Sequence, residues 1–406
     1  MEQKSTFFRQ SGWMVLATTF GGLLMWAVHK VATGSLAESE YSAFGMFLRV
    51  LNLMSIPACG LQAVFARQAA VALDEEGRSH LSALARGAAR LIVVFWGVCA
   101  LFVLVFHSQL QEIFKLSGLF LALSVAIGFL NLLRPIGVGI LQGKQDFCWV
   151  GWSQIFDGAG RLFMVMLILL WLKGQSAGAL TGVLFGLILC LGVCMWKTYD
   201  VWIKPGCKID LWYWVKSLAP LTFGAGIPLF MISADALVVQ AVFPAEKVNL
   251  YAAAGIVTQA LVFFTFPITA VMFPKIARSA AQSEETSVLL LALAVTGGMA
   301  GCVVLGTFLF PTLPIRIMFA PDYLPAAELI PWFSLAMLPL TMSTVLINNL
   351  LARGNYRMVP WLWCVAGIYL VTLLFKHESF IQVIELIGLF NTLMLGVVLF
   401  FSFRQK

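Results

Sequence analysis

The sequence predicts an all-α protein that crosses a membrane many times, and three observations carry this prediction. Hydrophobic residues make up 61% of the 406 positions and charged residues only 11%, and the mean hydropathy is +0.92. The apolar residues gather in runs of about 20, the length that spans a bilayer as a helix. Two parts of the chain repeat the same landmarks, which indicates two pseudo-symmetric lobes of six helices each.

Twelve apolar segments are long enough to cross a bilayer, and short connections separate them. The first follows Lys4 and Arg9 without a small-residue cleavage site after it, so we expect a retained helix rather than a signal peptide. The predicted spans are 10–32, 42–64, 86–106, 118–141, 150–172, 177–196, 215–243, 248–273, 287–310, 326–350, 358–375 and 380–402.

Lys and Arg residues are distributed unevenly over the predicted connections. With the N-terminus in the cytoplasm, 17 of the 26 fall on the cytoplasmic side and six on the opposite side. Such an excess marks the cytoplasmic face, so we expect both termini there. Membrane topology therefore explains the net charge of +7, and we expect no nucleic-acid partner.

The residues that metal and nucleophilic chemistry require are scattered along the chain. The eight cysteines form no CxxC pair, the four histidines lie far apart, and neither a P-loop nor an HExxH motif occurs. We therefore expect no cofactor, although a proton or sodium ion could drive the protein, and we predict no enzyme activity.

An internal repeat is visible in two stretches. The stretch YSAFGMFLRVLNLMSIP (41–57) aligns without a gap with YAAAGIVTQALVFFTFP (251–267). The stretch GILQGKQDF (139–147) aligns with LLARGNYRM (350–358) at nearly the same offset. The matched positions are Tyr41 with Tyr251, Gly45 with Gly255, Leu51 with Leu261, Pro57 with Pro267, and Gly143 with Gly354.

The repeat sets the expected domain organisation. Six spans per repeat give both halves the same orientation in the membrane, with a pseudo-twofold axis along the membrane normal. We predict an N-terminal lobe at 1–200, a cytoplasmic connection at 201–213 and a C-terminal lobe at 214–406.

Charged residues inside the predicted spans are candidates for function, because a charge at mid-bilayer costs about 2.5 to 3.5 kcal/mol on insertion scales. Their sum is positive in the first lobe and negative in the second, which predicts an anion site in one and a cation site in the other. The six residues are Arg49, Arg134, Asp157, Arg161, Asp235 and Glu385.

The arginines are the candidate anion ligands. Arg49 has no acidic residue within helical reach, and Asn52 continues its face; an unpaired guanidinium can grip phosphate with two parallel hydrogen bonds. The alternative is a structural arginine paired with another helix. Arg134 lies nearer the cytoplasm, where it could also extend to the membrane surface.

Asp157 and Arg161 lie four residues apart and so share one helix face. They form either a self-neutralised pair that packs two helices or an arginine aimed at a cavity by its carboxylate. Asp235 is the only charge deep in its span, and we name it, with Asp157, as a candidate for proton or sodium coupling. The alternative for Asp235 is a hydrogen-bonded structural carboxylate.

A neutral polar stripe runs along the predicted span 326–350. Its members offer hydroxyls and an amide to a hydrated headgroup, although such residues also serve helix packing. They are Ser334, Thr341, Thr344 and Asn348.

Three stretches give the chain a family resemblance: ESEYSAFGMF at the start of the second span, GILQGKQDF after the fourth, and FPITAVMFPKIARSA at the end of the eighth. With twelve spans in two lobes, they resemble the polysaccharide and O-antigen (Wzx-like) flippases of the multidrug/oligosaccharidyl-lipid/polysaccharide (MOP) exporter superfamily. The resemblance implies a MATE-like fold in the bacterial inner membrane. It also implies export of an undecaprenyl-pyrophosphate-linked oligosaccharide by alternating access, for surface polysaccharide and lipopolysaccharide biosynthesis.

The resemblance further implies that membrane arginines bind the lipid pyrophosphate. That role falls on Arg49, Arg134 and Arg161, with Asn52 and Asn348 as further candidate ligands. The implied partners are the lipid-linked oligosaccharide, membrane lipids and other polysaccharide-assembly proteins.

Two other functions stay open. A cation-coupled drug antiporter of the same superfamily would favour carboxylates in its cavity, and three membrane arginines argue against it. A membrane polysaccharide polymerase would commonly carry its catalytic residues on a large outer loop, whereas the longest one here, near 311–325, is short.

Overall fold

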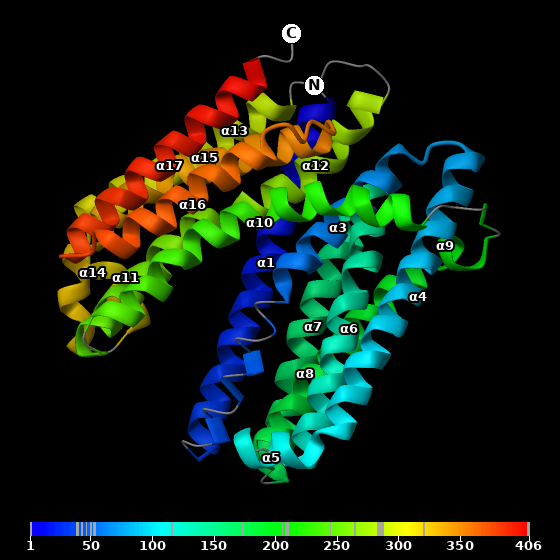
Figure 1. Ribbon diagram of the computed structural model, residues 1–406, viewed down its shortest axis with the longest axis horizontal. Helices are drawn as coiled ribbons and strands as arrows, with labels where there is room; N and C mark the ends of the chain where they lie inside the picture. Colours follow the sequence, from blue (N-terminus) through cyan, green and yellow to red (C-terminus); the bar gives the residue numbers. More distant parts are fainter. Residues whose placement is uncertain are drawn as a thin grey trace. The chain divides into compact units, whose positions relative to one another are not determined.

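The computed structural model describes residues 2–37, 40–41, 44–45, 47–48, 51, 54–114, 117–172, 174–204, 206–207, 211–243, 245–263, 265–281, 288–319 and 321–403. Within these residues the regular structure is helical throughout, with no strand, as predicted (Figure 1). The chain divides into two compact units, Met1–Thr222 and Phe223–Lys406.

Ten helices of the described part are long and apolar enough to cross a membrane, and they fall on ten of the predicted spans. An eleventh predicted span, 358–375, is the shorter apolar helix Val359–Phe375. The remaining one, 42–64, lies partly outside the described residues. The chain is therefore a multi-pass membrane protein.

In the first unit, α7 packs between α1 and α8, and α6 packs against α3 and α8 (Figure 1). The elements of this unit are α1 (Glu2–Ser35), α3 (Ser55–Val71), α4 (Glu75–Val105), α5 (His107–Phe114), α6 (Gly118–Gly143), α7 (Phe147–Met166), the π-helical turn η1 (Leu167–Trp171), α8 (Ser176–Lys197) and α9 (Tyr199–Ile203).

Glycines allow a close helix contact in this unit, between α6 and α3. A Cβ atom at Gly139 would lie 2.6 Å from the carbonyl oxygen of Gln62, and one at Gly143 would lie 2.4 Å from that of Ala66. The backbone of α3 thus occupies the space where a side chain would stand. Small residues of this kind bring membrane helices into van der Waals contact where no hydrophobic effect drives them together.

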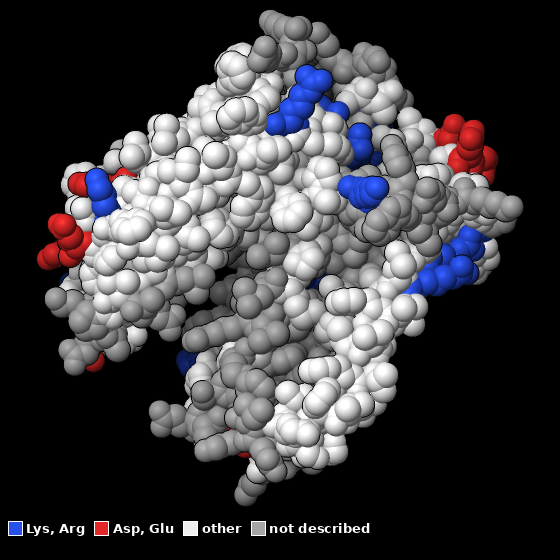
Figure 2. Space-filling view, viewed as in Figure 1, with Lys and Arg blue, Asp and Glu red and all other residues white. Residues whose placement is uncertain are grey.

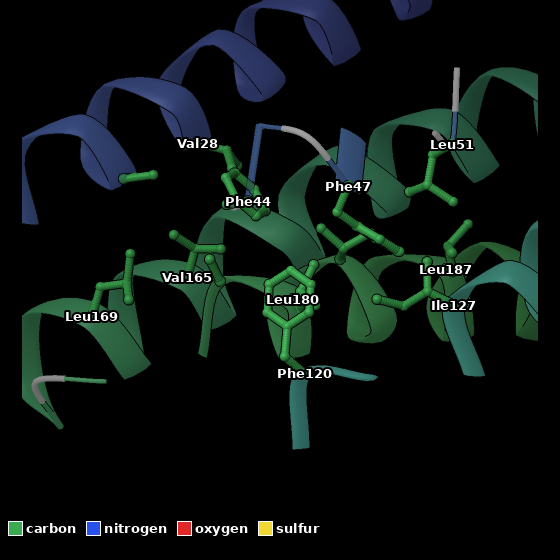
Figure 3. Packing of buried hydrophobic residues seen from close by; sticks show 13 residues of the cluster. Val28, Phe44, Phe47, Leu51, Phe120, Ile127, Val165, Leu169, Leu180 and Leu187 are labelled. Atoms are coloured by element: carbon green, nitrogen blue, oxygen red, sulfur yellow. The ribbon is translucent and has the colours of Figure 1, made fainter. Parts of the chain in front are cut away.

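A buried apolar cluster fills the part of the unit enclosed by α1, α6, α7 and α8 (Figure 3). Phe44, Phe47 and Leu51 insert into it from the segment between α1 and α3, and Phe47 meets Phe120 of α6 edge to face at 6.0 Å. These rings fix the first unit independently of its charged residues.

In the second unit, α11, α12, α13 and α17 all pack against α15, which is the most buried helix of the unit. The elements are α10 (Leu211–Val242), α11 (Ala245–Phe263), α12 (Thr265–Ala281), α13 (Val288–Leu309), α14 (Thr312–Met318), the 3-10 helix η2 (Pro321–Glu328), α15 (Ile330–Ala352), α16 (Val359–Phe375) and α17 (Phe380–Phe403).

Helix α10 contributes residues to both units, because the division falls between Thr222 and Phe223. A Cβ atom at Gly60 of α3 would lie 2.4 Å from Cα of Thr222. The next residue, Phe223, accepts a hydrogen bond at 3.2 Å from the indole of Trp363 on α16. The chain therefore passes from one unit to the other within a helix.

The repeat seen in the sequence has structural counterparts. Helices α3 and α12 are both 17 residues long and begin two residues before the aligned prolines, Pro57 and Pro267. The ends of α6 and α15 also match, but in a different register from the predicted one. Each closes with one residue of positive φ, Gln145 at 60° and Gly354 at 76°.

The predicted pairing of Gly143 with Gly354 is thus wrong by two residues, since Gly354 corresponds to Gln145. The left-handed position after a helix usually takes glycine, and the first unit has a glutamine there, so matching glycines gave the wrong register. The equivalent backbone bonds are Asp146 N to Leu141 O at 3.0 Å and Asn355 N to Leu350 O at 2.9 Å.

The helix flanks expose large apolar side chains, as a lipid environment requires. On α4, Val94, Val98 and Leu101 are each more than half exposed. On the face shown in Figure 2, broad surfaces carry no charge, and Lys, Arg, Asp and Glu form a few separate groups.

Candidate functional site

The first candidate site is built on α7, where Asp157 and Arg161 lie one turn apart. Arg161 donates from Nε to Oδ1 of Asp157 at 2.7 Å and from Nη2 to Oδ2 at 2.9 Å. This two-point geometry fixes the guanidinium in plane with the carboxylate. The helical spacing predicted the pair, and its side chains are about nine-tenths buried.

A second arginine joins this pair from a neighbouring helix. Arg134 of α6 donates from Nη1 to Oδ2 of Asp157 at 3.3 Å. Its side chain is 36% exposed, against 10% for Arg161. Two guanidinium groups therefore share one carboxylate, and the cluster keeps a net positive charge. The contact with Asp157 directs Arg134 to the interior of the unit.

Helix α8 holds the cluster in place through a glycine. A Cβ atom at Gly186 would lie 2.4 Å from Cγ of Arg161 and 2.8 Å from Oδ1 of Asp157. The absence of a side chain at Gly186 thus leaves the space that the ion pair fills. Arg161 and Asp157 are fixed by this packing, and Arg134 is the arginine with freedom to contact a ligand.

The second candidate site surrounds Asp235 of α10, which is 1% exposed. Tyr251 of α11 donates its hydroxyl to Oδ2 at 2.6 Å. Among the described residues, Oδ1 has no hydrogen-bond partner of normal geometry. A buried carboxylate oxygen without a partner is unusual, and it is suited to receive a proton or a metal cation.

A second tyrosine lies close to this carboxylate. Tyr369 of α16 is fully buried, and its hydroxyl has no partner among the described residues. It lies within electrostatic reach of both Asp235 and Tyr251. Neutral oxygen atoms beside a lone carboxylate are the ligand type that a hard monovalent or divalent cation prefers.

The sequence did not identify the two tyrosines as site residues. Tyr251 was visible only as a repeat landmark, and Tyr369 lies in an apolar run where Thr372 is the one polar residue three or four positions away. A neutral residue gives no charge signal, so its pairing with Asp235 required the packing of α10, α11 and α16.

The remaining predicted ligands are Arg49, Asn52 and Asn348. Arg49 and Asn52 lie outside the described residues. Asn348 lies in the second unit, on α15, and donates its amide to the carbonyl of Thr344 in its own helix at 2.8 Å. The hydroxyls of Thr341 and Thr344 likewise bond to their own helix, at 2.9 Å each. These three residues of the polar stripe therefore serve their own helix, whereas the buried hydroxyl of Ser334 has no partner among the described residues.

The part of the chain that the structure describes holds no group of three or more His, Cys, Asp or Glu residues arranged to bind a metal ion. Asp157 and Asp235 belong to different units. Each carboxylate thus has to be understood from its own neighbours.

Solved structures of the same fold are MATE transporters. A structure described as MATE in the straight conformation is similar with a TM-score of 0.78 at 16% identity, over 99% of this chain and 96% of that chain. An outward-facing multidrug resistance MATE family transporter of the MOP superfamily gives 0.79 at 15% identity, over 99% and 95%. MATE in complex with Br-NRF gives 0.71 at 15%, over 99% and 97%.

At this level of identity the likeness establishes the fold, and the predicted MATE-like fold is confirmed. No protein-family model and no curated protein matches the sequence.

Proposed function

We propose that the chain is a transporter, not an enzyme, that flips an undecaprenyl-pyrophosphate-linked oligosaccharide across the bacterial inner membrane by alternating access. Both termini would lie in the cytoplasm, and surface polysaccharide biosynthesis would use the product. The observation that carries this proposal is the excess of positive charge at Asp157, where two arginines meet one carboxylate.

The unequal bonding of the two arginines suggests how an anion is bound. Arg161 makes two short bonds and is fixed, whereas Arg134 makes one bond of 3.3 Å and is partly exposed. A pyrophosphate oxygen can compete for Arg134 without breaking the buried pair. Arg49, Asn52 and Asn348 stay predictions as further ligands.

Asp235 supplies the coupling in this proposal. An ion bound between Oδ1 and the neighbouring tyrosine oxygens would neutralise the carboxylate, and its release would restore a buried negative charge. These two states have different costs of burial, so an ion gradient can bias the transporter toward one of them. Asp157 could couple ions only by releasing an arginine.

A cation-coupled drug antiporter is the second candidate. The carboxylate of Asp235, with one oxygen lacking a hydrogen-bond partner of normal geometry among the described residues, favours drug transport as much as lipid flipping. One of the solved structures of the same fold is described as a multidrug resistance transporter. The arginine cluster distinguishes the two functions, since a cationic drug has no use for an excess of guanidinium groups.

The test uses purified protein in liposomes that contain a fluorescent lipid-linked oligosaccharide or, separately, a cationic dye. We expect flipping of the lipid under an ion gradient and no dye transport. Arg134→Ala should weaken lipid binding about tenfold to a hundredfold, the loss of a charge-assisted hydrogen bond of about 1.5 to 3 kcal/mol. Arg134→Lys should recover part of it, because it keeps the charge but loses the fork.

The coupling role is tested in the same liposomes. Asp235→Asn should abolish gradient-driven flipping and leave lipid-oligosaccharide binding intact, since the amide keeps the shape but cannot bind the ion as a charge. Dye transport without lipid flipping would replace the flippase by the antiporter. Equal gradient-driven flipping by Asp235→Asn would refute the coupling role.

A further inference from the structure

A groove between α15 and α17 opens on the surface of the second unit and encloses about 480 Å³. Its walls are apolar, and Leu335, Leu338, Pro339, Ile381 and Ile384 form most of them. Thr392 also lines the groove, but its hydroxyl donates to the carbonyl of Gly388 at 2.7 Å. The surface therefore suits a hydrocarbon chain.

One ionisable side chain, Glu385, lines this groove. It is exposed, and no Lys, Arg or His of the described residues lies within salt-bridge distance of it. The carboxylate lies in the second turn of α17, which begins at Phe380. A charge on the flank of a membrane helix needs a counter-charge or water, and the described part of the chain supplies no counter-charge.

The groove runs from a helix end toward the hydrocarbon. Trp332 lies in the first turn of α15, and it lines the groove together with Ile381 and Glu385 from the first two turns of α17, so the starts of the two helices lie at the same end. Seven residues separate Glu385 from Thr392, which places the apolar floor about 10 Å deeper along the helix. A charged mouth thus leads to an apolar floor.

Trp332 adds a donor at the mouth. Its ring is 54% exposed and meets Phe308 of α13 nearly edge to face at 5.7 Å, which fixes its orientation. Its indole N–H makes no hydrogen bond to a described residue. Tryptophan at this depth commonly contacts lipid headgroups through that N–H.

We propose that the groove between α15 and α17 binds a phospholipid whose headgroup carries a primary ammonium, phosphatidylethanolamine. The ammonium pairs with Glu385, the phosphate accepts from the indole of Trp332, and one acyl chain lies along the apolar walls. This arrangement gives both headgroup charges a partner. It uses residues distinct from the arginine cluster and from Asp235, and it holds whatever cargo the transporter carries.

The test measures lipid retained by the purified protein, with native mass spectrometry after exchange into equimolar dioleoyl phosphatidylethanolamine, phosphatidylcholine and phosphatidylglycerol. We expect preferential retention of phosphatidylethanolamine. Glu385→Gln should reduce the preference for phosphatidylethanolamine over phosphatidylcholine about fivefold. This factor corresponds to the upper end of the free energy of an exposed ion pair. The control is Glu378→Gln, which removes an exposed carboxylate that does not line the groove.

A second variant separates the headgroup contacts from folding. Trp332→Phe keeps an aromatic ring and leaves the charge of Glu385 in place, but it removes the indole N–H. It should therefore reduce retention of all phosphate-bearing lipids and preserve the preference for the ammonium headgroup. Melting temperatures in detergent should match the unmodified protein for both variants. Equal phosphatidylethanolamine preference in the unmodified protein and Glu385→Gln would overturn the proposal. So would Glu385-dependent binding of tetraphenylphosphonium without lipid retention, which would assign the groove to a small lipophilic cation.

Discussion

Two buried carboxylates, Asp157 in the first unit and Asp235 in the second, have opposite surroundings. Asp157 accepts three hydrogen bonds from Arg134 and Arg161, and both of its oxygens are used. Asp235 accepts one from the neutral hydroxyl of Tyr251, and its other oxygen has no hydrogen-bond partner of normal geometry among the described residues. The first carboxylate serves to hold cations that belong to the chain, and the second is suited to bind one that does not.

The comparison also shows why a count of charges is an incomplete guide. Each residue is the single acidic position in an apolar run, and the sequence distinguishes them only by Arg161, which lies four residues after Asp157. The helices that pack against them complete the difference, because α6 brings a second guanidinium group to Asp157 and α11 brings the hydroxyl of Tyr251 to Asp235. The function of a buried carboxylate follows from its partners.

Removing Asp157 should have the largest effect on stability. Asp157→Asn leaves Arg161 buried beside Arg134 without a counter-charge, and breaking a buried pair this way costs about 3 to 5 kcal/mol. The free energy of unfolding in detergent measures it.

The matched control for this variant is Asp200→Asn. Asp200 is paired with Lys144 at 2.7 Å, but its side chain is 52% exposed, so its loss should cost about 1 kcal/mol or less. Equal stability of the two variants would show that the buried, fully hydrogen-bonded carboxylate of Asp157 contributes no more than the exposed one of Asp200.

A smaller loss should follow from filling the space at Gly186. Gly186→Ala places a Cβ atom 2.4 Å from Cγ of Arg161, and overpacking of this kind costs about 1 to 3 kcal/mol. It should also reduce lipid-oligosaccharide binding. Displacement of Arg161 would change its bonds to Asp157 and so disturb the position of Arg134, which shares that carboxylate.

Gly192 on the same helix provides the control, since a Cβ atom there meets nothing within 4 Å. Gly192→Ala should leave stability unchanged or slightly raised, given the higher helix propensity of alanine. If thermal unfolding and binding fail to separate the two variants, α8 does not position the ion pair.

The smallest effect concerns the tyrosine at Asp235. Tyr251→Phe removes the only side-chain donor to this carboxylate among the described residues. It should destabilise the protein by about 1.5 kcal/mol, the lower range for a bond to a charged group. Tyr41→Phe, at the aligned position of the first unit, loses a contact of 3.2 Å with Nδ1 of His29. That neutral, partly buried contact should matter less, and chemical denaturation of both variants can compare them. A larger loss at Tyr41 would reverse the expected order.

Local pattern predicted the features that depend on local geometry. Run length predicted the spans, and four-residue spacing predicted the contact of Asp157 with Arg161. The bond from Arg134 to Asp157 was not predictable, because it joins different helices and has no fixed sequence separation. The same holds for Tyr369 beside Asp235. The helix-end register failed for another reason, since Gln145 adopts a backbone conformation that glycine usually takes.

The continuous course of α10 across the division of the two units has a mechanical consequence. A loop transmits tension only, whereas a helix is a strut that also carries torque and resists bending. Pro220 and Pro228 lie within α10 on either side of that division, and each removes one rung of the backbone ladder. Helices bend at such positions. Bending of this strut is therefore expected at Pro220 and Pro228 before it is expected elsewhere along α10.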